Sequence, residues 1–321
     1  MKIYARLLIA VMLLAPVSAR AADDYPSKTI TIVNLYAPGG VIDVVARSIA
    51  KKLSEKWKVP VIVENKPGAG GTLAAYYVVR QPADGYTVFI TDVSFSIVPS
   101  MYSKLSYDPM KDLEPLVLLG TVTQAFTITP NVGVSSIKEL VALAKKNPNK
   151  LTYASAGIGS LPHIGTEMFK KATATDIRQV PYRGSVPAFT DLLANRVDMY
   201  IGALATPLPY VKDGKLKLLA VMQQHRSPFV PDIPSIAELG YPELDFAAYY
   251  GLLARTGTPK PVIDKFVSAV QEALQSPEVK EVMAKLGDEI SGDGPEQFKA
   301  FLKKSMETWH RGFELTGVKP L

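Results

Sequence analysis

Glycine-rich turns follow two apolar runs near the start of the chain, and each turn opens a segment with helical spacing. The first turn is Ala37-Pro38-Gly39-Gly40, after residues 30–36, and the second is Gly68-Ala69-Gly70-Gly71, after residues 59–63. The first N–H groups of a helix lack intrahelical partners and carry the positive end of its dipole, and glycine lets a ligand approach them. These residues therefore favour main-chain binding of an anion. The alternative is that each glycine only relaxes a tight turn.

Comparable turns follow two later apolar runs. Asp92-Val93-Ser94 come after residues 86–91, where the Ser94 hydroxyl is either a ligand donor or a helix cap. Ala156-Gly157-Ile158-Gly159-Ser160 come after residues 151–155, and Pro162 suits the first turn of a helix. This is neither a dinucleotide fingerprint nor a phosphate loop, because the third glycine and the Gly-Lys pair are missing. For the two serines, Ser155 and Ser160, a simple helix-start role stays open.

Two side chains add charge or proton-transfer capacity. Arg183 follows the apolar residues 177–181 and either binds an anion or forms an ion pair with Asp191 or Asp198. His163 follows the third glycine turn and is either a general base or a hydrogen-bonded structural residue.

No established catalytic pattern accompanies these residues. The sequence has no Gly-x-Ser-x-Gly, no Ser-x-x-Lys together with its partner motifs, and no His-Glu-x-x-His. An exported hydrolase or transferase acting on an anionic substrate is the competing functional class. The three histidines are far apart and there is no cysteine, so the sequence predicts no metal site and no cofactor.

The elements that must position the turns are strands and helices in alternation. Two strand–turn–helix units about 30 residues apart fit neighbouring strands of a parallel sheet. The apolar run Leu116–Ile128 predicts a passage into a second unit near Thr123, and residues 246–254 predict the return. Ser136 with Glu139 resembles a capping box. The remainder, 259–316, is predicted to form three helices, over 262–274, 277–286 and 295–316.

Composition and the first residues limit the class of protein. Residues 1–6 are basic, 7–17 are apolar and 19–21 fit a small-x-small cleavage rule, which predicts a signal peptide over 1–21 and an exported, unlipidated product. Removing its three basic residues changes the net charge from +6 to 6 − 3 = +3, too little for a nucleic-acid-binding protein. About 300 residues without disulfides usually form two cores.

Several motifs resemble the Bug family, the periplasmic solute-binding proteins of tripartite tricarboxylate transporters. The motifs lie at 25–28, 37–47, 63–71, 84–87, 105–109, 180–184, 191–193 and 231–235. The resemblance implies an α/β, two-lobed periplasmic binding protein fold (Venus flytrap, type II-like), each lobe a sheet flanked by helices. It implies lobe one at 23–123 and 247–321 and lobe two at 124–246.

The resemblance also implies a monomeric periplasmic protein that is not an enzyme, binds a carboxylate through backbone amides, and delivers it to the membrane subunits of the transporter. Matching the family's loops to this sequence implies these ligand-binding residues: Tyr36, Ala37, Gly39, Gly40, Val41, Asp43, Gly70, Gly71, Thr72, Ser94, Phe95, Ser155, Ala156, Gly157, Ser160, Arg183, Gly202 and Ala203. His163 joins them from its position after the third glycine turn.

The first loop departs from the family's usual pattern. Tyr36-Ala37 replace a more common Phe-Pro, and Val41-Ile42 replace a small polar pair. The bulkier, less polar rim favours an aromatic acid such as terephthalate. Because glycine turns occur in both halves of the chain, we expect an anion site at each end of the solute and therefore a dicarboxylate.

Overall fold

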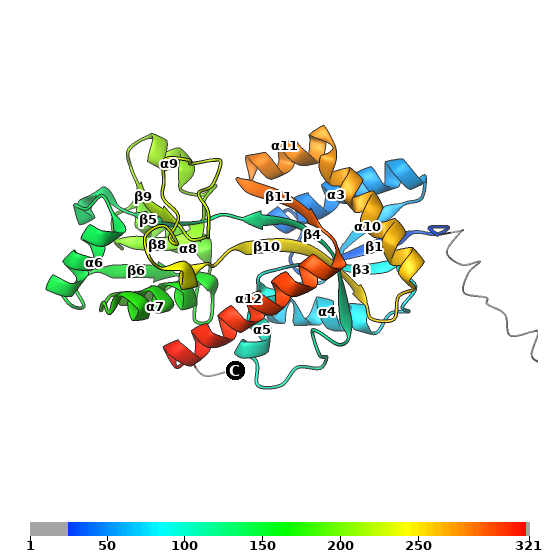
Figure 1. The fold of residues 1–321 in the computed structure, drawn as a ribbon, viewed down its shortest axis with the longest axis horizontal. Coiled ribbons are helices and arrows are strands. Elements are labelled where there is room, and N and C mark those ends of the chain that lie inside the picture. Colours follow the sequence, from blue (N-terminus) through cyan, green and yellow to red (C-terminus); the bar gives the residue numbers. More distant parts are fainter. Residues whose placement is uncertain (1–24, 319–321) are drawn as a thin grey trace, which may run out of the picture.

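Two β-sheets with helices on their faces make up the part of the chain that the computed structural model describes, residues 25–318 (Figure 1). The strand order is β11-β4-β10-β3-β1-β2 in the first sheet and β7-β6-β8-β5-β9 in the second. The α/β class predicted from the sequence is confirmed. The predicted signal peptide, 1–21, lies outside the described residues.

The first sheet begins with three parallel strands, β1 (Ile30–Asn34), β2 (Val61–Asn65) and β3 (Thr87–Asp92). Strand β10 (Ala248–Arg255) runs antiparallel to both β3 and β4 (Leu113–Val122). Consecutive residues such as Ile32 and Val33 are both buried, because helices cover both faces of the sheet.

Helices α3, α10 and α11 contact one another over one face, whereas α4, α5 and α12 lie on the other (Figure 1). Their bounds are α3 Val41–Trp57, η1 Ala69–Gly71, α4 Thr72–Val79, α5 Ser94–Met101, α10 Lys260–Gln275, α11 Pro277–Lys285 and α12 Pro295–Thr316. Each parallel strand is followed in the chain by the start of a helix: α3 after β1, η1 after β2 and α5 after β3. The three predicted turns lie at these junctions.

The second sheet repeats this arrangement. Its elements are β5 Gln124–Ile128, η2 Pro130–Val132, α6 Ile137–Lys146, β6 Thr152–Ser155, α7 Leu161–Thr173, β7 Arg178–Pro181, α8 Ser185–Leu193, β8 Met199–Ala203, α9 Leu208–Lys212, β9 Lys217–Val221 and η3 Pro242–Leu244. Side chains alternate along β8: Met199 and Ile201 join the core that contains α6 and α7, and Tyr200 joins the core under α8.

The predicted cap of α6 is present. The Ser136 hydroxyl accepts a hydrogen bond from the Glu139 backbone N–H at 3.2 Å, and the Glu139 carboxylate accepts one from the Ser135 N–H at 2.7 Å. Two of the N–H groups at this helix start thus have side-chain acceptors.

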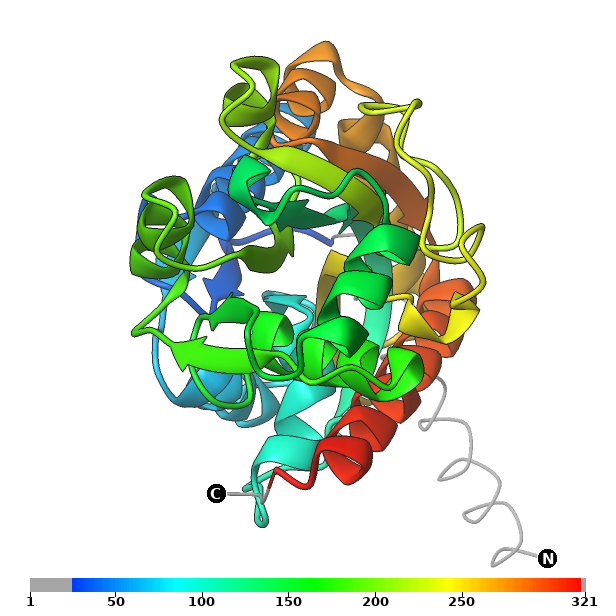
Figure 2. The same cartoon turned by 90° about the vertical axis from the view of Figure 1, so that its left-hand side faces the viewer.

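The chain passes between the sheets twice. Strand β4 ends at Val122 and β5 begins at Gln124, so Thr123 alone joins them. The return runs from β9 through residues 222–247 into β10, whose Ala248 pairs with Val122. Helix α12 contacts β4 of the first sheet and also α7, which packs against β6 and β8 of the second sheet (Figures 1 and 2).

Strand β11 (Asp288–Asp293) lies between the last two helices predicted in 259–316, where the sequence analysis predicted no strand. It pairs antiparallel with β4 at the edge of the first sheet. The approach is close, because a Cβ built on Gly120 would lie 2.5 Å from the Glu289 carbonyl oxygen. Tertiary pairing decides this strand, since Asp-Glu-Ile-Ser-Gly-Asp has no apolar alternation.

Candidate functional site

A cavity of about 440 Å³ lies between the two sheets and is lined by loops that follow strands of both. From the first sheet come the ends of β1 and β3, with η1, α5 and β10, and from the second the ends of β6 and β8. The predicted site residues among its lining are Tyr36, Gly70, Ser94, Ala156, Ser160, Gly202 and Ala203. The structure thus brings together turns that are up to 167 residues apart in sequence (203 − 36).

The other predicted site residues do not line this cavity. They are Ala37, Gly39, Gly40, Val41, Asp43, Gly71, Thr72, Phe95, Ser155, Gly157, His163 and Arg183. For several of these residues, the structure gives a physical reason.

Asp43 places a negative charge of the protein itself at the start of α3. Its buried carboxylate accepts hydrogen bonds from the Gly39 N–H at 3.0 Å, from Asn65 Nδ2 at 2.9 Å and from Arg47 Nε at 2.8 Å. Although burial alone would raise it, the hydrogen bonds from Arg47, Gly39 and Asn65 hold the pKa of Asp43 well below its usual range. The anion that the first glycine turn predicts is therefore supplied by the chain itself.

Gly71 faces the core. It is buried, and a Cβ built on it would lie 2.7 Å from Leu35 Cδ1. Next to it, the Thr72 hydroxyl donates to the Ala69 carbonyl at 3.0 Å. Of this turn, Gly70 lines the cavity.

His163 and Ser155 form internal hydrogen bonds. His163 Nδ1 accepts from the Gly159 N–H at 3.0 Å, and burial lowers the pKa of His163, so the neutral ring is favoured. The buried Ser155 hydroxyl accepts from Gln179 Nε2 at 2.8 Å. Of the two roles left open for His163, this geometry favours the structural one.

Arg183 is exposed on the loop before α8. Neither expected ion pair involves it: Asp191 pairs with Arg196 at 2.9 Å, and Asp198 accepts from the Thr152 N–H at 2.7 Å. Its guanidinium is thus not committed to either carboxylate.

The start of α7 differs from that of α3, where Asp43 accepts from the Gly39 N–H, and from that of α5, where Asp92 accepts from the Ser94 N–H. No acidic residue lies in its first turn, and its N-cap residue, Ser160, makes no capping hydrogen bond. The Ser160 hydroxyl instead donates to the Gly157 carbonyl at 2.7 Å. Ser160, Leu161 and Pro162 all line the cavity, so the positive end of this helix faces it without a protein counter-charge.

Comparisons with known proteins assign the family. The sequence profile described as "Tripartite tricarboxylate transporter family receptor" matches residues 45–317. The chain belongs to this family. Receptors of this family bind solutes and are not enzymes, so the hydrolase or transferase alternative is set aside.

Relatives of this receptor align with nearly the whole of its chain. It is 33% identical to Protein BugT of Bordetella pertussis over 307 residues, 95% of this chain and 93% of BugT. The structure of R. palustris Rpa4515 with adipate superimposes with a TM-score of 0.78 at 31% identity, covering 93% of this chain and all of that one. MatC from Rhodopseudomonas palustris with bound malate gives 0.73 at 28% identity, over 90% and 99%. The fold is that of a two-lobed periplasmic binding protein.

The receptor's cavity also contains residues that the sequence analysis did not select. Asp92 is the last residue of β3, Ile97, Val98 and Met101 belong to α5, and Tyr249 and Tyr250 belong to β10. Asp92 carries a detectable signal, since it is an acidic residue at a strand end on the rim already predicted. The β10 residues carry none, because they lie in an apolar run that also fits an ordinary core strand.

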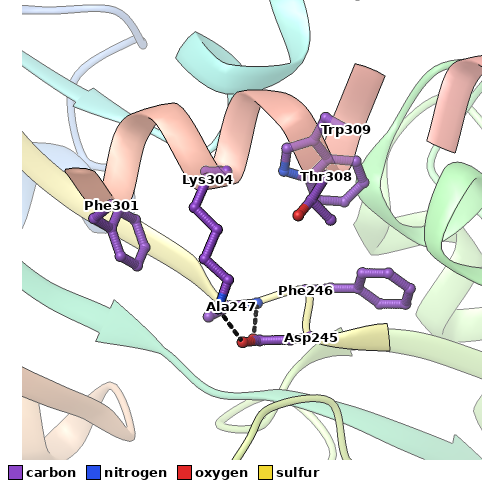
Figure 3. Close-up of a pocket in the computed structure, with 8 residues that line it drawn as sticks. Asp245, Phe246, Ala247, Phe301, Lys304, Thr308 and Trp309 are labelled. Atoms are coloured by element: carbon purple, nitrogen blue, oxygen red, sulfur yellow. Dashed lines mark hydrogen bonds and ion pairs between the residues drawn. The ribbon is translucent and has the colours of Figure 1, made fainter. Parts of the chain in front are cut away.

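A second, much smaller cavity of about 60 Å³ lies where the return strand of the receptor meets α12 (Figure 3). The Asp245 carboxylate accepts from the Ala247 N–H at 3.4 Å and lies 3.8 Å from Lys304 Nζ. Trp309 packs beside Phe246 with ring centroids 5.9 Å apart. This volume has room for only a few water molecules, which is too small for a solute of the kind that the larger cavity could bind.

Among residues 25–318, no helix of the receptor is long and apolar enough to cross a membrane. The same residues contain no group of three or more His, Cys, Asp or Glu placed to hold a metal ion.

Proposed function

We propose that this receptor is a periplasmic monomer that captures a carboxylate solute in the 440 Å³ cavity and delivers it to the membrane subunits of a tripartite tricarboxylate transporter. The observation that carries the proposal is the start of α7, an uncapped helix N-terminus that faces the cavity without an acidic neighbour. Adipate in one structural relative and malate in another support a carboxylate ligand.

The size and wall of the cavity support an extended or aromatic acid. Its volume lies within the range of small-molecule sites, about 300–1,000 Å³. Ile97, Val98, Met101, Ile158 and Leu161 give it an apolar wall. A six-carbon chain or a benzene ring fits such a wall, and a dicarboxylate such as terephthalate is the first compound to test.

Replacing Leu161 by proline tests the role of the α7 N-terminus. Proline is well tolerated at the first helical position and removes only the N–H there. We expect the proline variant to bind terephthalate or adipate at least tenfold more weakly than Leu161→Ala, which loses the same packing but keeps the N–H. Isothermal titration calorimetry measures both affinities. Equal affinities would remove this N–H from the carboxylate site.

We further propose that residues 23–123 and 247–321 form one lobe and residues 124–246 the other, joined near Thr123 and Ala247. The membership of the strands in the two sheets supports these bounds. A cavity with walls from both sheets supports closure of the lobes around the solute.

Closure predicts a smaller molecule when the solute is bound. With saturating ligand from the calorimetric screen, small-angle X-ray scattering is expected to give a lower radius of gyration. The Leu161→Pro variant at a ligand concentration near the wild-type Kd serves as the control and is expected to stay mostly in its unliganded profile. Superimposable profiles of the wild type with and without ligand would contradict closure.

A further inference from the structure

Asp92 places a carboxylate in the wall of the cavity, at the end of β3. No lysine, arginine or histidine is found among the described residues that line the cavity, and Asp92 is the one acidic side chain there. A solute in this cavity therefore meets a fixed negative charge with no cationic side chain beside it.

The partners of Asp92 fix its position. Oδ1 accepts from the Ser94 backbone N–H at 2.9 Å and from the Ser94 hydroxyl, and Oδ2 accepts from the Tyr36 hydroxyl at 3.1 Å. The carboxylate thus supplies the counter-charge for the start of α5, just as Asp43 does for α3. The first-sheet side of the cavity offers an acceptor where the sequence predicted an anion site.

The two sides of the cavity thus differ in charge preference. The α7 side presents an uncapped helix N-terminus, and the β3 side presents a carboxylate. If a solute places a carboxylate beside Asp92 in this enclosed space, the two groups cannot both stay ionised without a large cost in free energy. One of the two therefore holds a proton.

We infer that Asp92 selects solutes that donate a hydrogen bond to it, so that the ligand is a carboxylate whose far end carries a donor. An amide or ammonium group supplies the donor directly. A dicarboxylate supplies it by binding with one proton. This inference rests on the proposed function, since it assumes that the carboxylate of the solute lies at α7.

The surroundings of Asp92 agree with this role. Burial raises the pKa of Asp92 despite its hydrogen bonds from Ser94 and Tyr36, so its environment favours a shared proton. The titratable groups near it are the hydroxyls of Tyr36, Tyr249 and Tyr250, with Asp288 beside Tyr250. None of them is a cation that would neutralise Asp92.

The test compares solutes that differ only at the far end. The probes are 4-carbamoylbenzoate against monomethyl terephthalate, and 5-carbamoylpentanoate against monomethyl adipate, titrated at pH 7.5 by calorimetry. In each pair the amide donates and the ester does not. For the wild type we expect the amide to bind at least tenfold more tightly than the ester in the pair that fits the cavity.

Asp92→Asn is the decisive variant, because it keeps an acceptor for the Ser94 N–H and loses the charge. We expect the ratio of the amide's affinity to the ester's affinity to fall to within threefold of unity. Asp232→Asn, on an exposed residue, makes the same change in net charge and should leave the ratio unchanged. An unchanged ratio in Asp92→Asn, or no discrimination in the wild type, overturns the inference.

The wild type alone provides a second measurement that needs no variant. Lowering the pH from 7.5 to 5.5 should strengthen terephthalate binding at least tenfold, because the required proton becomes up to about 100-fold more available. Binding of 4-carbamoylbenzoate should change by less than threefold. Equal pH responses overturn the inference, whereas failure of every probe to bind contradicts the proposed function itself.

Discussion

Replacing Gly71 by valine is expected to lower the free energy of unfolding by about 4 kcal/mol. Gly71 has a φ of +93°, which a β-branched residue adopts only with strain. Its new Cβ would also lie 2.7 Å from Cδ1 and 3.3 Å from Cβ of Leu35, a buried residue directly after β1. Backbone strain and overpacking therefore act together. Urea denaturation of the purified proteins measures the effect.

Gly39→Val is the matched control for Gly71→Val. Gly39 has a similar φ of +85°, but a Cβ there meets no atom within 4 Å. We expect it to cost about 1–2 kcal/mol, so the difference between the variants reports the contact with Leu35. A Gly71→Val protein of wild-type stability that no longer binds carboxylates would contradict this account. It would return Gly71 to the ligand site that the sequence analysis predicted.

Asp288→Asn is expected to stabilise the receptor by about 3 kcal/mol more at pH 8 than at pH 5. Both Asp288 carboxylate oxygens are buried, and neither has a partner in hydrogen-bond geometry among the described residues. Burial raises the pKa of Asp288 from 3.8 to about 7, and the nearby Tyr250 hydroxyl offsets only part of this. Ionised Asp288 is thus a cost to the folded state.

The direction of the effect follows from proton binding. Below pH 3.8 both states hold the proton, and between there and about pH 7 the folded state holds it while the unfolded chain loses it. The wild type therefore loses stability as the pH rises through this window, and asparagine, which carries no charge, does not. Urea titrations at pH 5 and pH 8 measure the difference, with the exposed Asp232→Asn as the control. A pH-independent difference between Asp288→Asn and wild type would mean that Asp288 titrates normally.

Local patterns in the sequence predicted most of the elements. The turn at Gly39 and Gly40, the cap at Ser136 and the apolar run broken at Thr123 each lie where the structure has the corresponding feature. Each depends on chemistry within a few residues, which a single sequence carries. Strand β11 was missed because its pairing with β4 depends on Gly120, more than 160 residues earlier (288 − 120 = 168).

The candidate site was harder to predict, because the direction in which each residue faces decides whether it lines the cavity. Spacing alone could not distinguish Gly70, which lines the cavity, from Gly71, which faces Leu35. Nor could it reveal that two carboxylates of the chain, Asp43 and Asp92, already accept hydrogen bonds from backbone N–H groups at two of the helix starts. The glycine turns predict where anions are favoured, and only the structure identifies which of those places the protein fills itself.

The packing of Trp309 at the return passage makes the receptor its own fluorescence probe. Trp309 is 1% exposed, in α12 beside Phe246, where the chain re-enters the first sheet. The chain's other indole, Trp57, packs with Tyr25 and Phe266 at the first sheet and its helices. A rearrangement at the return passage therefore alters the emission of one tryptophan and spares the other. The proposed closure is therefore expected to change the tryptophan emission of the native chain when a solute binds, without a label.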